Sequence, residues 1–324
     1  MKHFKSFLAP QLQQYADYRQ ALGYAKKCIK PPLLAFDRYL IDQNANWNQL
    51  QPAFFLQLRA KISDHPNTAN RILSALRSFF QFLVRQDICD NNPLKDISPL
   101  PERYFVPFVF SAGQTERLLQ AASQNIRKTP KYFLTDMAIY LAIVLLAHCG
   151  MRINEPLRMH RDQYCRHDGT VYIEKTKFRK DRLIPVPQIA LTQIENYLAV
   201  RTALRADDQN PYLLAARKQR QLRGRQVRDA FHQAVKDIRI SQPKQVIGNI
   251  TFGKPLPHSL RHGFAINTLN QIKARGNCPQ QALPILATYM GHRKYQYTAA
   301  YLKVKDAKDI PGLIAFTKSQ LDVI

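Results

Sequence analysis

The sequence predicts a mainly α-helical protein with a small β-sheet, built from two domains. The length of 324 residues is more than one small domain ordinarily needs. Most segments have helical character, and only residues 170–174 and 182–186 have the composition of short strands. Prolines at positions 93, 99, 101 and 107 separate a first domain, residues 1–97, from a second, residues 108–324, through an extended linker over residues 98–107.

The first domain is expected to be all-helical, with helices near residues 4–22, 31–43, 51–63 and 67–87. The last of these has one apolar face, for which packing in a core is the simplest explanation; it is made by Ile72, Leu73, Leu76, Phe79, Phe80 and Leu83. Its polar face includes Arg71 and Arg77. These two side chains either contact phosphates or belong to a solvated face.

The second domain is expected to open with a helix capped by Ser111 and Gln114, which are spaced as in a capping box. A buried helix at residues 131–149 follows, and the two strands then form a hairpin with charged residues between them. Pro279 and Gly291 suit the start and the end of a helix. Further helices are expected near residues 188–204, 219–238, 258–273, 280–290 and, as a tail, 306–319.

The charge of the chain indicates a polyanionic partner. The formal net charge is +25 at pH 7, and a surplus of that size opposes compact folding unless an anion offsets it. Nucleic acid is the first candidate and an anionic membrane the second. The longest apolar run, Met137 to Ala147, is far shorter than the ~20 residues that span a bilayer. No signal peptide is expected, because the N-terminus lacks a sustained apolar stretch.

Cysteine usage indicates the inside of the cell. The five cysteines are odd in number and widely spaced, and no two of them form a CxxC pair. This pattern argues against a disulfide framework and against a zinc site. We therefore expect no metal.

Four short segments carry the candidate catalytic residues. Arg152 follows Gly150 directly after the buried helix, and the planar fork of an arginine suits a phosphate. His258, Arg261 and His262 share one face of a helix. The other two segments hold Lys177 in the hairpin turn and Tyr301, nine residues after His292. Each segment alone has an ordinary explanation: a surface ion pair with Glu155, a solvated turn, a chance pair of His and Arg, and a structural tyrosine.

Taken together, the four segments favour covalent catalysis. A tyrosine has a free pKa of about 10 and is a poor nucleophile at neutral pH unless its neighbours stabilise the phenolate or accept its proton. Arginines and histidines gathered around one phosphate would do both.

The order of these segments resembles the tyrosine recombinase family, which includes phage integrase-like and Xer-like proteins, over residues 1–305. The matching pattern is Gly-Met-Arg-x-x-Glu, a hairpin lysine, His-x-Leu-Arg-His, and Gly-His followed by a tyrosine. The resemblance implies a helical, SAM-like core-binding domain that binds DNA and an α+β catalytic domain. It further implies a site-specific recombinase or integrase that cleaves and rejoins DNA through a 3′-phosphotyrosyl bond.

The resemblance implies a role for each candidate residue. Arg152 and Arg261 would grip the scissile phosphate, with Glu155 and His262 supporting them. His258 would accept the proton of the nucleophile Tyr301, His292 would orient the phosphate, and Lys177 would protonate the leaving 5′-oxygen. The hairpin lacks the usual glycines of the family, so Lys175 stays an alternative to Lys177. Cys149 stands where the family often has threonine.

A basic segment before the His-x-Leu-Arg helix lies in a region that lines the DNA in the family. It either contacts phosphates, which is the interpretation that we favour, or forms a solubilising face. Its basic residues are Arg217, Lys218, Arg220, Arg223, Arg225 and Arg228.

The resemblance also implies partners and a place of action. We expect double-stranded DNA, a homo-tetramer on two synapsed sites, no cofactor, and action in the bacterial cytoplasm at the nucleoid. The tail would dock on a neighbouring protomer through Leu313, Ile314 and Phe316. A partner recombinase or a directionality factor is a further candidate, and we favour a role in a mobile element. Two alternatives stay open: a DNA-binding accessory or regulatory protein without catalysis, and a type IB topoisomerase-like relaxer or hairpin-forming resolvase.

Overall fold

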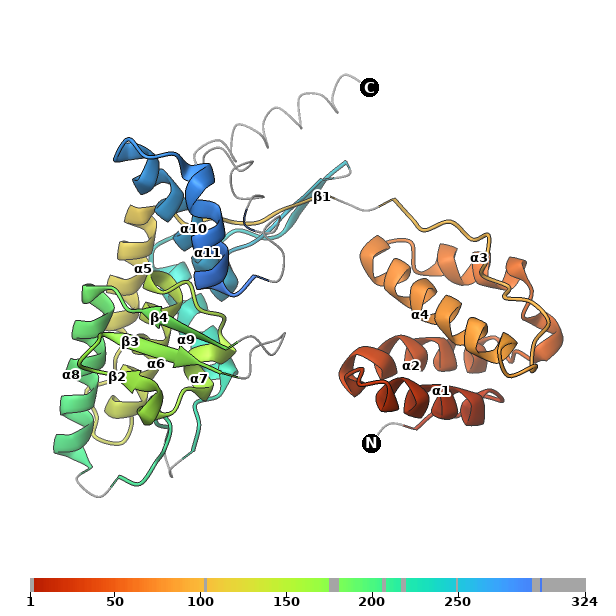
Figure 1. Ribbon diagram of the computed structural model, residues 1–324, viewed down its shortest axis with the longest axis horizontal. Coiled ribbons are helices and arrows are strands. Elements are labelled where there is room, and N and C mark those ends of the chain that lie inside the picture. The colour runs from red at the N-terminus through yellow and green to blue at the C-terminus, as the bar shows by residue number, and fades with distance from the viewer. Residues whose placement is uncertain are drawn as a thin grey trace. The chain divides into compact units, whose positions relative to one another are not determined.

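The computed structural model describes residues 3–101, 104–174, 181–205, 208–216, 220–248, 250–292 and 298. The chain divides into two compact units, residues 1–104 and 105–324 (Figure 1). The division falls inside the segment for which a linker is predicted. The tail helix predicted near residues 306–319 lies outside the described residues.

Over residues 3–101, the first unit is a bundle of four α-helices and one short 3₁₀ helix. Helix α4 (Pro66–Val84) packs against α1 (Ala9–Ala21) and α2 (Lys26–Asp42). The six residues of the predicted apolar face of α4 are all buried in one core, which confirms the expectation for that face. The remaining elements are η1 (Trp47–Gln49) and α3 (Pro52–Lys61), which begins with a proline at a position where no backbone donor is lost.

Two helix starts in the first unit were predicted wrongly. Helix α1 begins at Ala9 rather than near residue 4, because the backbone N–H groups of Lys5 and Ser6 donate to the buried carboxylate of Asp37 at 2.9–3.1 Å. Helix α2 begins five residues before the predicted start and contains Pro31 and Pro32. Ile29, which lies before both prolines, is buried in the same core. This burial offsets the loss of two backbone donors.

The second unit is built around the apolar helix α6 (Phe133–His148). The longer helices that pack against it are α5 (Ala112–Gln124), α8 (Gln188–Leu204), α9 (Gly224–Asp237) and α10 (Pro257–Ala274) (Figure 1). The short α7 (Asn154–Arg158) follows α6, and α11 (Pro279–Met290) packs against α10. The capping box of α5 is confirmed, because Gln114 N–H donates to Ser111 Oγ and Ser111 N–H donates to Gln114 Oε1.

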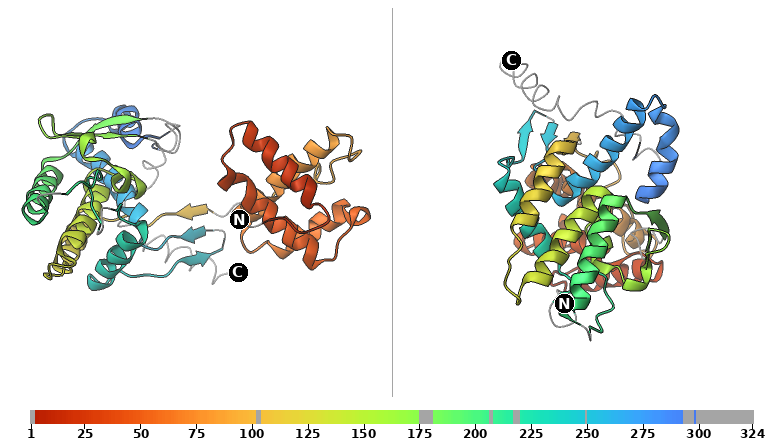
Figure 2. Two further views of the ribbon diagram at one scale, coloured as in Figure 1. Left: turned by 90° about the horizontal axis from the view of Figure 1, so that it is seen from below. Right: turned by 90° about the vertical axis from the view of Figure 1, so that its left-hand side faces the viewer.

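The predicted hairpin belongs to a three-stranded antiparallel sheet on one side of α6 (Figure 2). Strand β3 (Thr170–Ile173) pairs with β2 (Tyr164–Cys165) and with β4 (Arg182–Pro185). Val171 faces Ile184 across the pair, and both side chains are buried. The alternation of buried and exposed residues along β3 and β4 fixes which face packs on the helices. The 3₁₀ helix η2 (Arg161–Gln163) precedes β2.

A second three-stranded sheet was not predicted. Strands β5 (Gln245–Ile247) and β6 (Ile250–Phe252) are antiparallel, and β1 (Tyr104–Val106), from the predicted linker, pairs with β6. Gly248 has a φ of +56° between the two strands. The Gly-Asn dipeptide between two β-branched runs was the available signal for this hairpin.

Among the described residues, no helix combines the length and the apolar character that a membrane crossing requires.

Candidate active site

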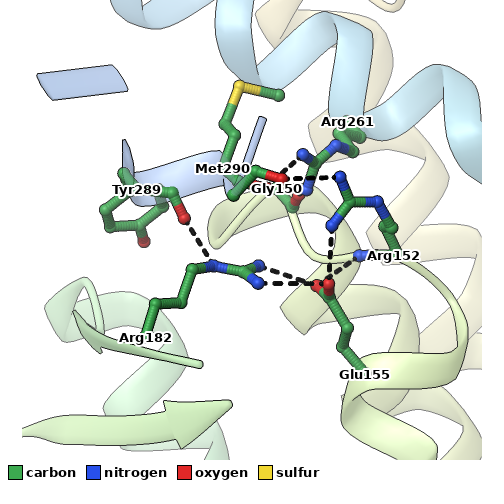
Figure 3. A network of polar contacts seen from close by, with 8 residues as sticks. Gly150, Arg152, Glu155, Arg182, Arg261, Tyr289 and Met290 are labelled. Atoms are coloured by element: carbon green, nitrogen blue, oxygen red, sulfur yellow. Dashed lines mark hydrogen bonds and ion pairs between the residues drawn. The ribbon is translucent and has the colours of Figure 1, made fainter. Parts of the chain in front are cut away.

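The site forms where the ends of three helices of the second unit meet. These are the C-terminal end of α6 with the turn into α7, the N-terminal end of α10, and the C-terminal end of α11 (Figure 3). Three arginines from different elements donate to the last carbonyl groups of α11: Arg182 to Tyr289, Arg261 to Met290, and Arg152 to Gly291. The carbonyl end of a helix carries partial negative charge, which favours cations.

The turn after α6 aims Arg152 away from the core. Gly150 has a φ of +56°, and a Cβ atom there would collide with the ring of Phe264. After this turn Met151 enters the core, whereas the Arg152 side chain stays 24% exposed. The Arg152 Nη2 group donates to the Gly291 carbonyl oxygen at 3.0 Å.

Arg261 is almost fully buried, with 1% of its surface exposed. Its Nη1 group donates to the Gly150 carbonyl oxygen at 2.5 Å, and its Nη2 group to the Met290 carbonyl oxygen. A guanidinium buried in this way has a fixed place, because its hydrogen bonds reach backbone atoms of two separate segments. The predicted pair of arginines, Arg152 and Arg261, is therefore brought together around the last turn of α11.

Glu155 lies between two arginines. Its Oε2 atom accepts from the Arg152 backbone N–H at 2.8 Å and from Arg182 Nη2 at 2.9 Å. Its Oε1 atom accepts from Arg152 Nη1 at 3.0 Å and from Arg182 Nη1 at 3.2 Å. Burial alone would raise the pKa of Glu155, but the hydrogen bonds and charge of Arg182, with the Arg152 backbone bond and the charge of Arg261, lower it below its ordinary value. The surface ion pair considered for Arg152 thus exists, within a larger buried network.

The three predicted histidines are held in their neutral form. Burial, followed by the charge of Arg261, lowers the pKa of His258 and lowers the pKa of His292 to about 4. Burial and the neighbouring His258 lower the pKa of His262 to about 3. The rings of His258 and His262 lie 4.7 Å apart, edge to face, and His292 Nδ1 lies 2.7 Å from the Thr298 hydroxyl. Neutral imidazoles can accept a proton, which a general base must do.

Two predicted catalytic residues are not placed. Lys177, its alternative Lys175, and Tyr301 lie outside the described residues, and so do Arg217 and Lys218. The described part of the chain contains no group of three or more His, Cys, Asp or Glu side chains arranged to hold a metal ion.

The candidate DNA-binding arginines differ in their surroundings. Arg71 is exposed on α4. Arg77, by contrast, donates from Nε to the Leu94 carbonyl oxygen at 3.0 Å and from Nη2 to the Ile97 carbonyl oxygen at 2.6 Å. Its guanidinium therefore holds the segment that follows α4, and its contact with DNA stays a prediction.

The basic segment before and within α9 is exposed next to α7. Arg220 and Arg223 line a hollow of about 480 Å³ together with Arg158 of α7. Arg225 and Arg228 are exposed as well, although Arg225 pairs with Asp229 at 3.5 Å. Asn154, the neighbour of Glu155 in the chain, lines the same hollow.

Sequence reasoning missed Arg182 as a site residue and placed it only as the first residue of the predicted strand 182–186. Its first position in a strand with buried alternate residues was the signal that could have found it, because such a charged side chain needs buried partners.

Comparisons with known proteins give one consistent family. Residues 109–308 match the phage integrase family, and residues 30–87 match its N-terminal SAM-like domain. The chain is 28% identical over 306 residues to y4rE of Sinorhizobium fredii, a protein that carries an integrase/recombinase name, with 93% of each chain covered. It is 28% identical over 279 residues to the tyrosine recombinase XerD of Proteus mirabilis, covering 84% of this chain and 80% of that one.

Solved structures share the fold at low sequence identity. A lambda integrase dimer bound to a COC′ core site matches with a TM-score of 0.69 and 18% identity, over 94% of this chain and 78% of that one. A lambda integrase tetramer bound to a Holliday junction matches with a TM-score of 0.67 and 17% identity, over 91% and 76%.

Proposed function

The chain belongs to the phage integrase family, the tyrosine recombinases, and from that premise we propose that it cleaves and rejoins DNA strands at specific sites with Tyr301 as its nucleophile. The proposed reaction joins the Tyr301 oxygen to the scissile phosphate and releases a free 5′-hydroxyl. The 5′-hydroxyl of a partner strand then attacks the 3′-phosphotyrosyl bond and restores a phosphodiester. The bond energy is kept in the covalent link, so religation needs no ATP.

One observation carries this proposal: α10 and the segments that follow α6 and α11 bring two arginines and three histidines with lowered pKa values close to one another. In the proposed roles, Arg152 and Arg261 stabilise the negative charge that develops on the phosphate in the transition state. His258 accepts the proton of Tyr301, and His292 orients the phosphate. The lowered pKa of His258 supports its role, because a protonated imidazole could not act as the base.

Lys177 is proposed as the acid that protonates the leaving 5′-oxygen. It follows strand β3, whose partner β4 places Arg182 in direct contact with Glu155. This connection supports a hairpin lysine close to the phosphate.

Double-stranded DNA is the proposed substrate, bound by both units: residues 1–97 as a helical DNA-binding domain and residues 108–324 as the catalytic domain. The net charge of +25 supports this partner. Assembly into a tetramer on two synapsed sites is proposed as well, since a lambda integrase of the same fold is a tetramer on a Holliday junction. Docking of the tail through Leu313, Ile314 and Phe316, a directionality factor, and action at the bacterial nucleoid belong to the same proposal.

Covalent trapping tests the nucleophile. The substrate is duplex DNA from the sequence that flanks the gene, with a 5′-bridging phosphorothiolate at successive positions of each strand, so that the released thiol does not religate. We expect a denaturation-resistant adduct whose linked peptide contains Tyr301. Tyr301→Phe should bind the DNA equally well and form no adduct, whereas Tyr172→Phe, at an exposed tyrosine of β3, should react normally. An adduct that persists in Tyr301→Phe would exclude Tyr301 as the nucleophile.

A further inference from the structure

Arg182 is the first residue of β4 and donates every hydrogen bond described for it to the site. Its Nη1 and Nη2 groups hold the two oxygens of Glu155 at 3.2 and 2.9 Å, and its Nε group donates to the Tyr289 carbonyl oxygen at 2.8 Å. The side chain is 7% exposed. Figure 3 shows the guanidinium between the carboxylate and the end of α11.

This ion pair needs an explanation other than stability. Taking two charges out of water costs so much that a well-packed apolar pair is often as stable or more stable. A bidentate pair between arginine and carboxylate does supply a fixed relative geometry. The fixed geometry of the pair therefore matters through the residues that Glu155 contacts.

Glu155 touches Arg152 at two points, the backbone N–H and the Nη1 group. With the two bonds from Arg182, each oxygen of the carboxylate accepts two hydrogen bonds, so its plane is set from both sides. Arg152 Nη1 is thus directed by a carboxylate that Arg182 orients, and Arg152 Nη2 is directed by the Gly291 carbonyl group. An arginine with one terminal nitrogen held by each of these groups has a defined guanidinium plane.

We propose that Arg182 is a positioning residue for DNA cleavage: it fixes the Glu155 carboxylate, which in turn fixes the guanidinium of Arg152 on the scissile phosphate. This inference rests on the proposed function. Arg182 itself does not touch the phosphate in this account. The charge of Arg182 also helps to keep Glu155 ionised, and an ionised carboxylate accepts from Arg152 without competing for the donor.

The chain offers a matched control. Arg201 of α8 is 1% exposed, pairs with Asp208 at 2.7 Å, and donates to the carbonyl groups of Asn210, Tyr212 and Leu213. It is as buried and as well bonded as Arg182, but it contacts none of the site residues in these bonds. Arg201→Met should lower the melting temperature without lowering the cleavage rate below that temperature.

The experiment measures single-turnover cleavage of the phosphorothiolate DNA by the full chain, with DNA affinity and the melting temperature in parallel. The wild type must first form the Tyr301 adduct; if it does not, the proposed function fails, whatever Arg182 does. Arg182→Met is expected to lower the cleavage rate roughly 100-fold, the loss that a misplacement of about 1 Å can cause. DNA affinity should stay unchanged. Arg182→Lys should not restore the rate, because lysine lacks the fork.

The pathway through Glu155 is tested with Glu155→Gln and with the double variant Arg182→Met/Glu155→Gln. If Arg182 acts through the carboxylate, the double variant cleaves at the rate of Glu155→Gln alone, while its melting temperature recovers relative to Arg182→Met because no buried charge is left unpaired. The acid limb of the pH–rate profile should also move to higher pH in Arg182→Met. Equal losses from Arg182→Met in both backgrounds, or cleavage that recovers in step with the melting temperature, would overturn the proposal.

Discussion

Arg182 of β4 and Glu155 of α7 form a bidentate ion pair with N–O distances of 2.9 and 3.2 Å, and both side chains are more than nine-tenths buried. The pair joins a strand of the predicted catalytic hairpin to the helix that follows the turn carrying Arg152. Both side chains are buried and bonded on both sides, and the conformation of the neighbouring backbone leaves room for them.

Gly291 is part of this neighbouring backbone. It has a φ of +65°, and an added Cβ atom would lie 2.9 Å from Arg182 Nη1. Gly291→Ala should lower the free energy of unfolding by about 1–2 kcal/mol from backbone strain, and it should also slow DNA cleavage because Arg182 must move. Gly276 has a φ of +79° and no atom within 4 Å of an added Cβ. Gly276→Ala should therefore lower the free energy of unfolding through backbone strain and leave the cleavage rate unchanged. Urea denaturation and single-turnover cleavage of both variants check this, and equal cleavage by the two would contradict it.

Replacements of Arg71 and Arg77 should have different effects: one should weaken DNA binding and the other should lower the stability of the fold. Arg77→Ala removes two hydrogen bonds to the Leu94 and Ile97 carbonyl groups, so we expect a loss of about 1–3 kcal/mol in the free energy of unfolding. Arg71→Ala, at an exposed position, should change that quantity by less than about 0.5 kcal/mol. It should weaken DNA binding and reduce the slope of log K against log salt by about 0.9. The reverse assignment of the two effects would show that Arg77 is the residue that contacts phosphate.

The neutral histidines predict a loss of stability in mild acid. The pKa values of His262 and His292 are lowered to about 3 and about 4 in the folded protein, whereas the unfolded chain protonates these rings near pH 6.5. Below that pH the unfolded state binds more protons, so the free energy of unfolding falls by up to about 1.4 kcal/mol per pH unit for His262 until the folded ring titrates. The partly exposed His292 contributes less, because solvent screens its interactions. His262→Asn should remove one such contribution. Denaturation between pH 7 and pH 5 measures it, and an unchanged slope in the variant would refute the account.

The arginines beside the hollow between α7 and α9 should contribute affinity without sequence preference. Arg223→Ala and Arg228→Ala are expected to weaken specific and non-specific DNA alike, each with a reduction of about 0.9 in the salt slope, because phosphate contacts carry no base information. Arg127→Ala is the control, since Arg127 is committed to Asp136 at 2.7 Å. DNA affinity measured by fluorescence anisotropy at several salt concentrations tests this prediction. A loss of affinity confined to one DNA sequence would indicate base contacts instead.

Most elements of the fold could be predicted from hydrophobic periodicity and from helix-capping residues. The apolar face of α4, the capping box at Ser111 and the strands β3 and β4 follow from local patterns, and the mainly helical class with small sheets is confirmed. The starts of α1 and α2 could not be predicted, because they depend on contacts between distant residues: Asp37 captures the backbone before α1, and the burial of Ile29 extends α2 through two prolines.

The candidate site was predicted as a set of residues but not as a network. Order and spacing selected Arg152, His258, Arg261 and His292, and the structure places these four residues near one another; their catalytic roles stay predictions. Arg182 was missed because its partners come from α7 and α11, which no local pattern links to β4. The roles of Lys177 and Tyr301 stay predictions that the trapping experiment addresses.

Three carbonyl groups at the end of α11 each accept a hydrogen bond from a different arginine. This arrangement limits which substitutions the site can accept during evolution. A replacement of Arg152, Arg182 or Arg261 leaves one of these carbonyl groups without its donor. We therefore expect exchanges at these three positions to be rare, because each one leaves a carbonyl acceptor of the site without its donor. In descendants of this chain, drift should spare these arginines together and accumulate on the outer faces of the helices, where one exchange does not disturb the next.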